Sequence, residues 1–294
     1  MPERPGTAAA ARPDYVIALR KPPATLRAAR ERPRWVRLLD SRFVRRLAIL
    51  TVLALAWQAY GRVASNDLIF PTLTETARTF WQILVHGRLL THTLISLDLL
   101  LQAYAIGVVL AFCLVVPAVS FRIGADVLST LTAMFNPLPA IALLPLAMLW
   151  FGLGQSSIVF VTVHSVLWAV ALNALAGFQS VSETVRMAGR NMGMRRLRYV
   201  FCLLIPAALP SILAGLRVGW AFAWRTIIAA EMVFGASSGP GGIGWFIFEK
   251  RDTMDTSAVF AGLATVVLIG LAVESALFRN IETHTVRKWG MQRS

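Results

Sequence analysis

The chain is divided into long apolar runs separated by short polar segments. Six runs can be separated, at residues 47–63, 93–119, 126–150, 156–177, 204–234 and 257–278. An α-helix needs about 20 mostly apolar residues to cross a bilayer, and the first run is slightly short of that length. The pattern predicts an all-α integral membrane protein with six transmembrane helices.

The composition agrees with this class. Hydrophobic residues make up 56% of the chain and charged residues 15%, whereas soluble domains carry about 25% charged residues. The net charge of +14 does not indicate nucleic-acid binding, because the arginines lie in tails and loops rather than on folded basic faces with stacking aromatics. The two cysteines and four histidines have no metal-ligand spacing. We therefore expect no metal site.

The distribution of basic residues predicts the orientation. Residues 1–46 hold 12 of the 29 lysines and arginines and contain no secretory h-region. With this segment inside, 22 basic residues face the cytoplasm and five face outward. The positive-inside rule then predicts both termini inside. We interpret residues 1–46 as a disordered cytoplasmic tail rather than an organellar transit peptide, 47–278 as the membrane domain and 279–294 as a basic cytoplasmic tail.

An amphipathic helix is expected between the first two runs. Pro71 suits a first helical turn, and Thr72 with Glu75 has capping-box spacing. Apolar residues then recur at helical spacing at Leu73, Ala77, Phe80, Trp81, Leu84 and Val85. This pattern predicts a helix that lies at the membrane interface.

Prolines cluster in two of the runs. Pro137, Pro139 and Pro145 lie in the third run, and Pro206 and Pro210 open the fifth. A proline inside a spanning helix removes a backbone hydrogen bond. Broken helices of this kind commonly build transport pathways, although prolines are also generally frequent in membrane helices.

Several polar side chains fall inside the runs, where they are costly and are candidates for function. Arg217 and Glu231 share a face of one helix but lie about 21 Å apart along it, so each needs another partner. Arg225 would suit an oxyanion passing through. The candidate path residues are Asn136, His164, Arg217, Arg225 and Glu231. Salt bridges or hydrogen bonds between helices are the alternative role for each of them, and Asp98 and Glu274 are interpreted as structural partners.

One long basic segment interrupts the runs at residues 178–200, with four arginines around Gly193. Residues 188–190, Gly193, Ile205-Pro206 and Leu209-Pro210 together resemble the EAA loop of ABC-importer permeases, most closely the nitrate/sulfonate/taurine family. Residues 65–290 carry further similar motifs, among them IFPTLTETARTFWQIL, LPAIALLPLAMLWFGLG, AGLR, AAEM and GGIGW. The sequence departs from the family pattern at Met187, where the family has glutamate, and at Gly189, where it has alanine. Glu183 is four residues too early to replace that glutamate.

The resemblance implies that residues 181–203, here called the coupling loop, form a short helix that docks on a separate ATPase. The residues implied in coupling are Met187, Ala188, Gly189, Arg190, Gly193, Leu197, Pro206 and Pro210. Gly193 permits a sharp turn because glycine enters positive-φ conformations freely, and Pro206 is expected to mark a bend. Arg190, Arg195, Arg196 and Arg198 either contact the ATPase or anchor the loop by the positive-inside rule.

No GxxxxGK[ST] sequence occurs, and residues 237–244 read as a flexible external turn rather than a phosphate loop. The chain is therefore not expected to be an enzyme, and ATP with Mg²⁺ would be bound by the partner. The resemblance also implies a homodimer in the bacterial inner membrane and an extracytoplasmic solute-binding protein. The predicted function is the permease subunit for a small anion such as a sulfonate, taurine or nitrate. A secondary carrier and a membrane-embedded enzyme stay open as alternatives.

Overall fold

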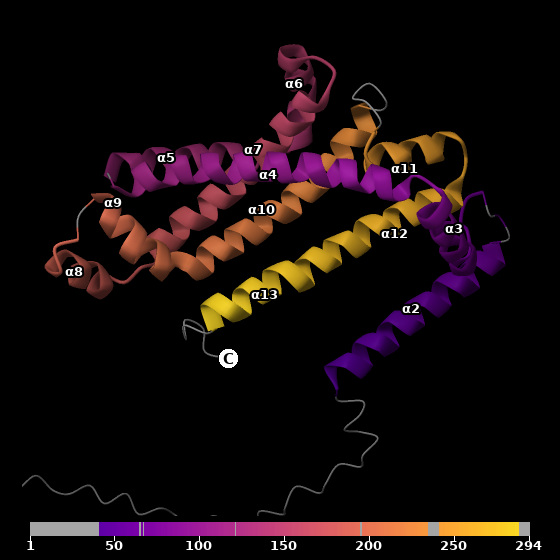
Figure 1. The fold of residues 1–294 in the computed structure, drawn as a ribbon, viewed down its shortest axis with the longest axis horizontal. Coiled ribbons are helices and arrows are strands. Elements are labelled where there is room, and N and C mark those ends of the chain that lie inside the picture. The colour runs from indigo at the N-terminus through magenta and orange to yellow at the C-terminus, as the bar shows by residue number, and fades with distance from the viewer. Residues whose placement is uncertain are drawn as a thin grey trace, which may run out of the picture. The chain divides into compact units, whose positions relative to one another are not determined.

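The computed structural model describes residues 41–64, 66, 68–120, 122–194, 196–234 and 241–287. Every regular element in this part of the chain is a helix (Figure 1). The predictions for residues 1–40, for Arg195, for the first half of the turn at 237–244 and for residues 288–294 lie outside the described residues.

Five helical stretches are long and apolar enough to cross a membrane. They are α2 (Arg42–Ala64), α4 (Leu89–Ser120), α7 (Gln155–Gln179), a stretch ending in α10 (Ile205–Phe234), and a stretch beginning with α12 (Thr256–Ala272). Each contains one of the predicted runs. The last stretch continues through η4 (Val273–Phe278), α13 (Arg279–Glu282) and η5 (Thr283–Arg287), so helix extends beyond the predicted start of the C-terminal tail at 279.

The third predicted run is not one continuous helix. It consists of α5 (Arg122–Phe135), a short η1 turn (Ala140–Leu143) and α6 (Leu144–Phe151), and the two arms meet at 86° (Figure 1). Pro137 and Pro139 explain the break, because each lacks an N–H donor and disfavours helical geometry in the residue before it. The candidate membrane spans among the described residues therefore number five, or six if this bent pair is counted as one.

The helix α3 (Leu73–His86) forms where it was predicted. The Thr72 side chain accepts a hydrogen bond from the Glu75 N–H at 3.3 Å, which confirms the cap. Pro71 precedes the cap instead of occupying the first turn, and its carbonyl accepts from Trp57 Nε1 at 3.1 Å. The predicted apolar stripe is divided, since Phe80 and Leu84 pack on α11 (Ile243–Asp252) and its neighbours whereas Trp81 is 65% exposed.

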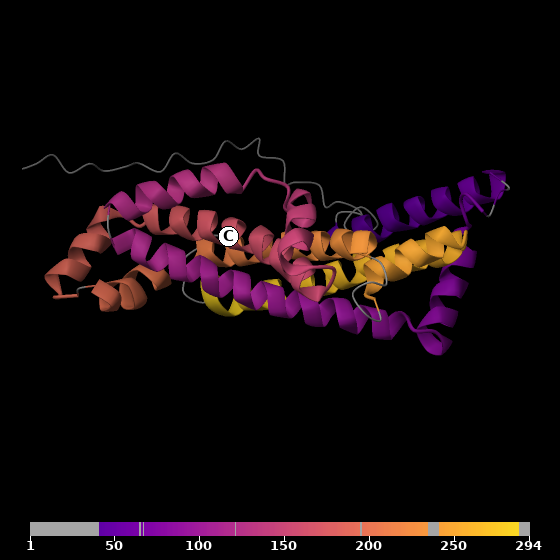
Figure 2. The same ribbon diagram turned by 90° about the horizontal axis from the view of Figure 1, so that it is seen from above.

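The core lies where α4, α7 and α10 run side by side (Figures 1 and 2). Glycines bring α10 close to α7. A β-carbon on Gly177 would lie 2.5 Å from Cβ of Ser211, and one on Gly215 would lie 2.7 Å from Cβ of Asn173. Small residues at such contacts let membrane helices pack tightly without a hydrophobic driving force.

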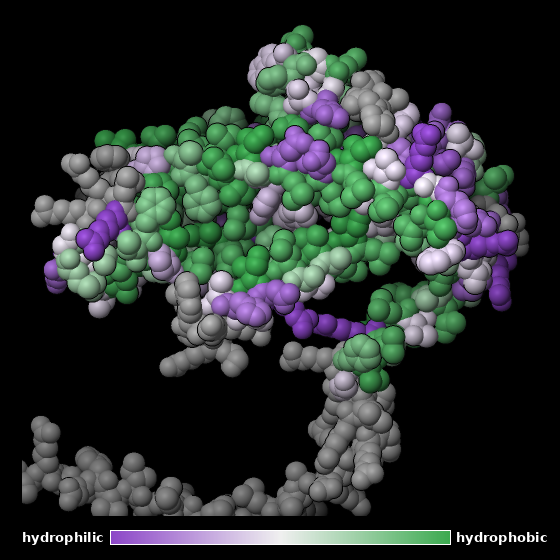
Figure 3. Space-filling view, in the orientation of Figure 1, coloured by the Kyte–Doolittle hydropathy of each residue, from purple (hydrophilic) through white to green (hydrophobic). Residues whose placement is uncertain are grey.

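The outward faces of these helices are apolar. Hydrophobic side chains cover much of the face seen in Figure 3, with hydrophilic ones gathered around α3 and α11. Large apolar residues such as Leu101, Val109 and Leu268 are about half exposed or more. A soluble protein rarely exposes contiguous apolar surface of this kind, so the faces fit a lipid environment.

Candidate functional site

The coupling loop contains a short amphipathic helix, α8 (Glu183–Asn191). Its outer face exposes Met187, Ala188 and Arg190, whereas Gly189 is buried. A β-carbon on Gly189 would lie 2.5 Å from Cδ2 of Leu203 and 3.3 Å from the Tyr199 ring. The departure from alanine at this position therefore has a packing reason, because α8 lies directly against the helical turns that follow it.

Arg186 ties α8 to the end of α7. Its Nη2 donates to the Phe178 carbonyl at 2.5 Å and its Nε donates to the Val181 carbonyl at 3.1 Å. Carbonyls at a helix C-terminus lack partners within the helix and carry partial negative charge. Sequence reasoning did not single out Arg186. The sequence did contain a signal for this role, because Arg186 is a basic residue that closely follows the end of an apolar run.

The turn after α8 closes on Gly193. This residue has φ +74°, its N–H donates to the Arg190 carbonyl at 3.0 Å, and the Met194 N–H donates to the Gly189 carbonyl at 3.1 Å. This pair of bonds around a left-handed glycine is a Schellman motif. The prediction that Gly193 supplies a positive-φ turn is confirmed.

The exposed side chains of α8 make only a weak ion pair with one another. Arg190 and Glu183 lie 3.6 Å apart, and both side chains are more than 60% exposed. Exposed pairs of this kind contribute at most about 1 kcal/mol. Arg190 and Met187 are therefore free to contact another surface.

The prolines after the loop do not break the span. The chain passes through α9 (Arg196–Tyr199), which contains Leu197, and a π-helical turn η2 (Val200–Leu204) directly into α10. Pro206 lies in the first turn of α10 and Pro210 inside it. Pro206 follows directly on the π turn, a geometry that accommodates disturbed backbone bonding within a continuous helix, and the bend expected at Pro206 stays a prediction.

Three of the five candidate path residues meet at the break between α5 and η1. Asn136, His164 and Arg225 line a cavity of about 280 Å³. Its other lining residues are Phe135, Pro137, Leu138, Pro139, Ala140, Ser165, Trp168, Phe222 and Thr226. The helix break thus creates a hollow beside α7 and α10.

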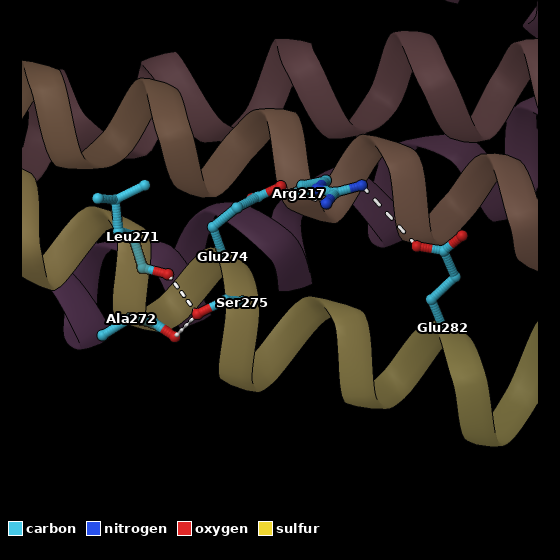
Figure 4. A network of polar contacts seen from close by, with 6 residues as sticks. All are labelled: Arg217, Leu271, Ala272, Glu274, Ser275 and Glu282. Carbon is cyan, nitrogen blue, oxygen red and sulfur yellow. Dashed lines mark hydrogen bonds and ion pairs between the residues drawn. The ribbon is translucent and has the colours of Figure 1, made fainter. Parts of the chain in front are cut away.

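Arg217 lies elsewhere, in an ion pair with Glu274 on η4 (Figure 4). A second carboxylate, on Glu282, lies 3.9 Å from its Nη1. Ser275, next to Glu274, bonds back to the Leu271 carbonyl at 2.7 Å. The partner that helical geometry required for Arg217 is therefore supplied by the last helical stretch, and Arg217 does not line the cavity.

Glu231 is also engaged in packing. It is 2% exposed, accepts from Ser96 Oγ at 2.7 Å and 2.8 Å, and accepts from the Gly244 N–H at 2.9 Å. Ser96 Oγ in turn accepts from the Ile243 N–H at 2.8 Å. A carboxylate is favoured at a helix N-terminus, and here it joins α4 and α10 to the start of α11.

These features describe a multi-pass all-α membrane protein with a helical loop that has an exposed face, and with a broken span. Residues 103–283 match the family described as "Binding-protein-dependent transport system inner membrane component". The chain belongs to this family of ABC-importer permeases. It is a multi-pass inner-membrane protein and a permease component rather than an enzyme.

The chain is also similar to individual permeases with named substrates. The chain is 32% identical over 151 residues to the taurine transport system permease protein TauC of Escherichia coli, covering 51% of this chain and 54% of TauC. It is 31% identical over 149 residues to the nitrate import permease protein NrtB of Synechocystis, covering 51% and 53%. It is 27% identical over 215 residues to the putative aliphatic sulfonates transport permease protein SsuC of E. coli, covering 73% and 80%.

Proposed function

We propose that this chain is the translocation subunit of an ABC importer for a small anion. The family assignment supports the class, and the relatives named for taurine, sulfonates and nitrate support the substrate range. The structural observation that carries the proposal is α8, a rigid helix with an exposed face, fixed to α7 by Arg186 and closed by a Schellman turn at Gly193.

The proposed partners follow from this role. A separate ATP-binding subunit, which holds ATP and Mg²⁺, grips α8 on the cytoplasmic side, and a solute-binding protein delivers the anion outside. Two copies of the chain form the pathway within the membrane lipid. The basic N-terminal segment and coupling loop favour both termini inside, with the bent α5–α6 pair counted as a span.

Force transfer requires that α8 move as a unit with the membrane helices. The Arg186 bonds reach the last turn of α7, and Gly189 packs against Leu203 ahead of α10. Closure of the ATPase pair would therefore displace α7 and α10 together. Both helices line the cavity beside the α5 break, so the proposed mechanism is alternating access around that region.

The test is co-purification of the permease with its ATP-binding subunit, followed by ATPase and uptake assays in proteoliposomes. We expect ATP-dependent uptake that requires both subunits and the solute-binding protein. Uptake that is driven by an ion gradient without nucleotide would contradict the proposal and favour a secondary carrier. External labelling of a cysteine placed at Met187 in intact cells would contradict the orientation.

A further inference from the structure

The cavity beside the α5 break has walls of two chemical kinds. One part is aromatic, where Phe135 and Trp168 stack with ring centroids 5.0 Å apart and planes at 15°. His164 meets Phe135 edge-on at 6.3 Å and 82°. The other part is polar and is formed by Arg225, Asn136, Ser165 and Thr226. A ligand that filled this space would need both an apolar body and a polar group.

Among the residues that the structure describes, Arg225 is the only formally charged side chain that lines the cavity. Its Nε donates to the Ala221 carbonyl at 3.0 Å, and its guanidinium carbon lies 5.0 Å from the centroid of the Phe222 ring. Within the described part of the chain, no carboxylate forms an ion pair with it, in contrast to Arg217. An arginine in a membrane helix calls for an anionic partner, and its planar donor fork matches a carboxylate or sulfonate.

Buried polar nitrogens beside the cavity also lack partners among the described residues. Both ring nitrogens of His164 and Nε1 of Trp168 are buried without a hydrogen bond among the described residues. An unsatisfied buried donor costs about 1–3 kcal/mol. A ligand with several acceptor oxygens could accept from the Trp168 N–H and from the one N–H of a neutral His164 after small side-chain movements.

The lining discriminates among the anions that a permease of this family could carry. The cavity holds the volume of about nine water molecules at ~30 Å³ each, far more than nitrate fills. An aromatic body would gain by contact with the Trp168 and Phe135 rings. An ammonium group, as in taurine, would meet the positive charge of Arg225, and no carboxylate in the lining would offset it.

We propose that this cavity binds an organic oxyanion with an apolar, preferably aromatic body and no amino group. The inference rests on the proposed function, because it names the substrate class of that transporter. Arg225 contacts the oxyanion, Asn136 and His164 provide further polar contacts, and Trp168 with Phe135 contacts the body. Benzenesulfonate is a probe with these properties, whereas methanesulfonate, taurine and nitrate each lack at least one of them.

The experiment measures binding of the four anions to the full-length permease in nanodiscs by calorimetry, without ATP or other subunits. We expect benzenesulfonate to bind at least about tenfold more tightly than taurine or nitrate, and more tightly than methanesulfonate. Arg225→Ala should weaken its binding at least about tenfold. Arg225→Lys keeps the charge and should retain part of the affinity. Trp168→Phe keeps an aromatic ring but loses the indole N–H.

Arg251→Ala is the matched control, because Arg251 also lies over a phenylalanine ring, Phe248 at 4.5 Å, but does not line the cavity. It should bind benzenesulfonate as the wild type does. Equal affinity in Arg225→Ala, tighter binding of taurine, or an equal loss in Arg251→Ala would overturn the inference.

Parallel uptake assays with the complete transporter separate the two proposals. If ATP-driven uptake proceeds but the permease binds none of the four anions, the cavity inference fails and the proposed function stands. If benzenesulfonate binds as expected but no ATP-binding subunit supports uptake, the proposed function fails, and the cavity is an anion site in a protein of another mechanism.

Discussion

Gly189 lies so close to Leu203 that a β-carbon on the glycine would fall 2.5 Å from Cδ2 of the leucine. The contact joins α8 to the π-helical turn that leads into α10. It couples the exposed loop helix to a membrane helix through packing rather than charge. Under the proposed function, this contact is the route by which the loop transmits movement, with Met187 at the position where the resemblance implies a glutamate.

Gly189→Val should overpack this contact, at a cost of about 1–3 kcal/mol. We expect reduced stimulation of the ATPase and uptake lowered severalfold while the permease still inserts. Leu203→Ala in the same chain removes the clashing methyl groups and should restore much of the activity. A double variant that is as impaired as the single variant would show that the contact is not what limits coupling.

Gly193→Ala tests the turn itself. Nothing lies within 4 Å of a β-carbon at this position, so only the backbone angle of +74° opposes a side chain. A left-handed conformation costs a non-glycine residue about 1–2 kcal/mol, and asparagine tolerates it better. We therefore expect lower ATPase stimulation for Gly193→Ala and near-normal values for Gly193→Asn. Gly193→Glu should uncouple ATP hydrolysis from uptake while insertion stays intact.

Arg186→Ala removes hydrogen bonds to the Phe178 carbonyl in the last turn of α7 and to the Val181 carbonyl just after it. Each such bond to a charged group contributes about 1.5–3 kcal/mol. We expect faster hydrogen exchange in residues 183–194 and weaker coupling. Arg190→Ala is the control for loss of a basic charge in the same helix, because the Arg190 side chain is 63% exposed. It should leave exchange in α8 unchanged, and equal effects of the two variants would contradict a specific role for Arg186.

Hydropathy predicted the spans well because apolar content is what a bilayer selects. It could not show that residues 126–150 form two helices, because hydropathy averages side-chain polarity and takes no account of the backbone N–H that proline lacks. Pro137 and Pro139 carried that information, but the angle of 86° depends on packing against α7.

Helical geometry also predicted correctly that Arg217 and Glu231 could not pair. It could not identify Glu274 or Ser96 as their partners, because neighbours on other helices follow from tertiary packing. The gathering of Asn136, His164 and Arg225 around one cavity likewise required the positions of three separate elements.

The pair of Arg217 and Glu274 lends itself to a double-mutant cycle. Both side chains are more than 40% exposed at the protein surface, where lipid would surround them in a spanning helix. Arg217→Ala and Glu274→Gln should each lower the melting temperature in lipid nanodiscs, because the first leaves Glu274 without its partner and the second leaves Arg217 with only the more distant carboxylate of Glu282. The melting temperature of the double variant should fall by less than the sum of the decreases in the two single variants. Strict additivity would mean that the two groups do not interact in the membrane.

Glu231→Gln tests the contact between α4, α10 and α11. The two carboxylate oxygens share the single O–H proton of Ser96, at 2.7 Å and 2.8 Å, and one of them also accepts from the Gly244 N–H, whereas an amide offers only one acceptor oxygen. A β-carbon on Gly242 would lie 2.0 Å from Oε1 of Glu231, so the carboxylate cannot shift toward that side. The variant should therefore open the start of α11, seen as faster hydrogen exchange at residues 243–246, and lower the melting temperature.

Ser96→Ala removes the shared donor and should produce the same exchange pattern with a smaller shift in melting temperature. Because neither residue lines the cavity, binding of benzenesulfonate should change little in either variant, and a selective loss of binding with normal exchange would assign Glu231 to the solute path instead.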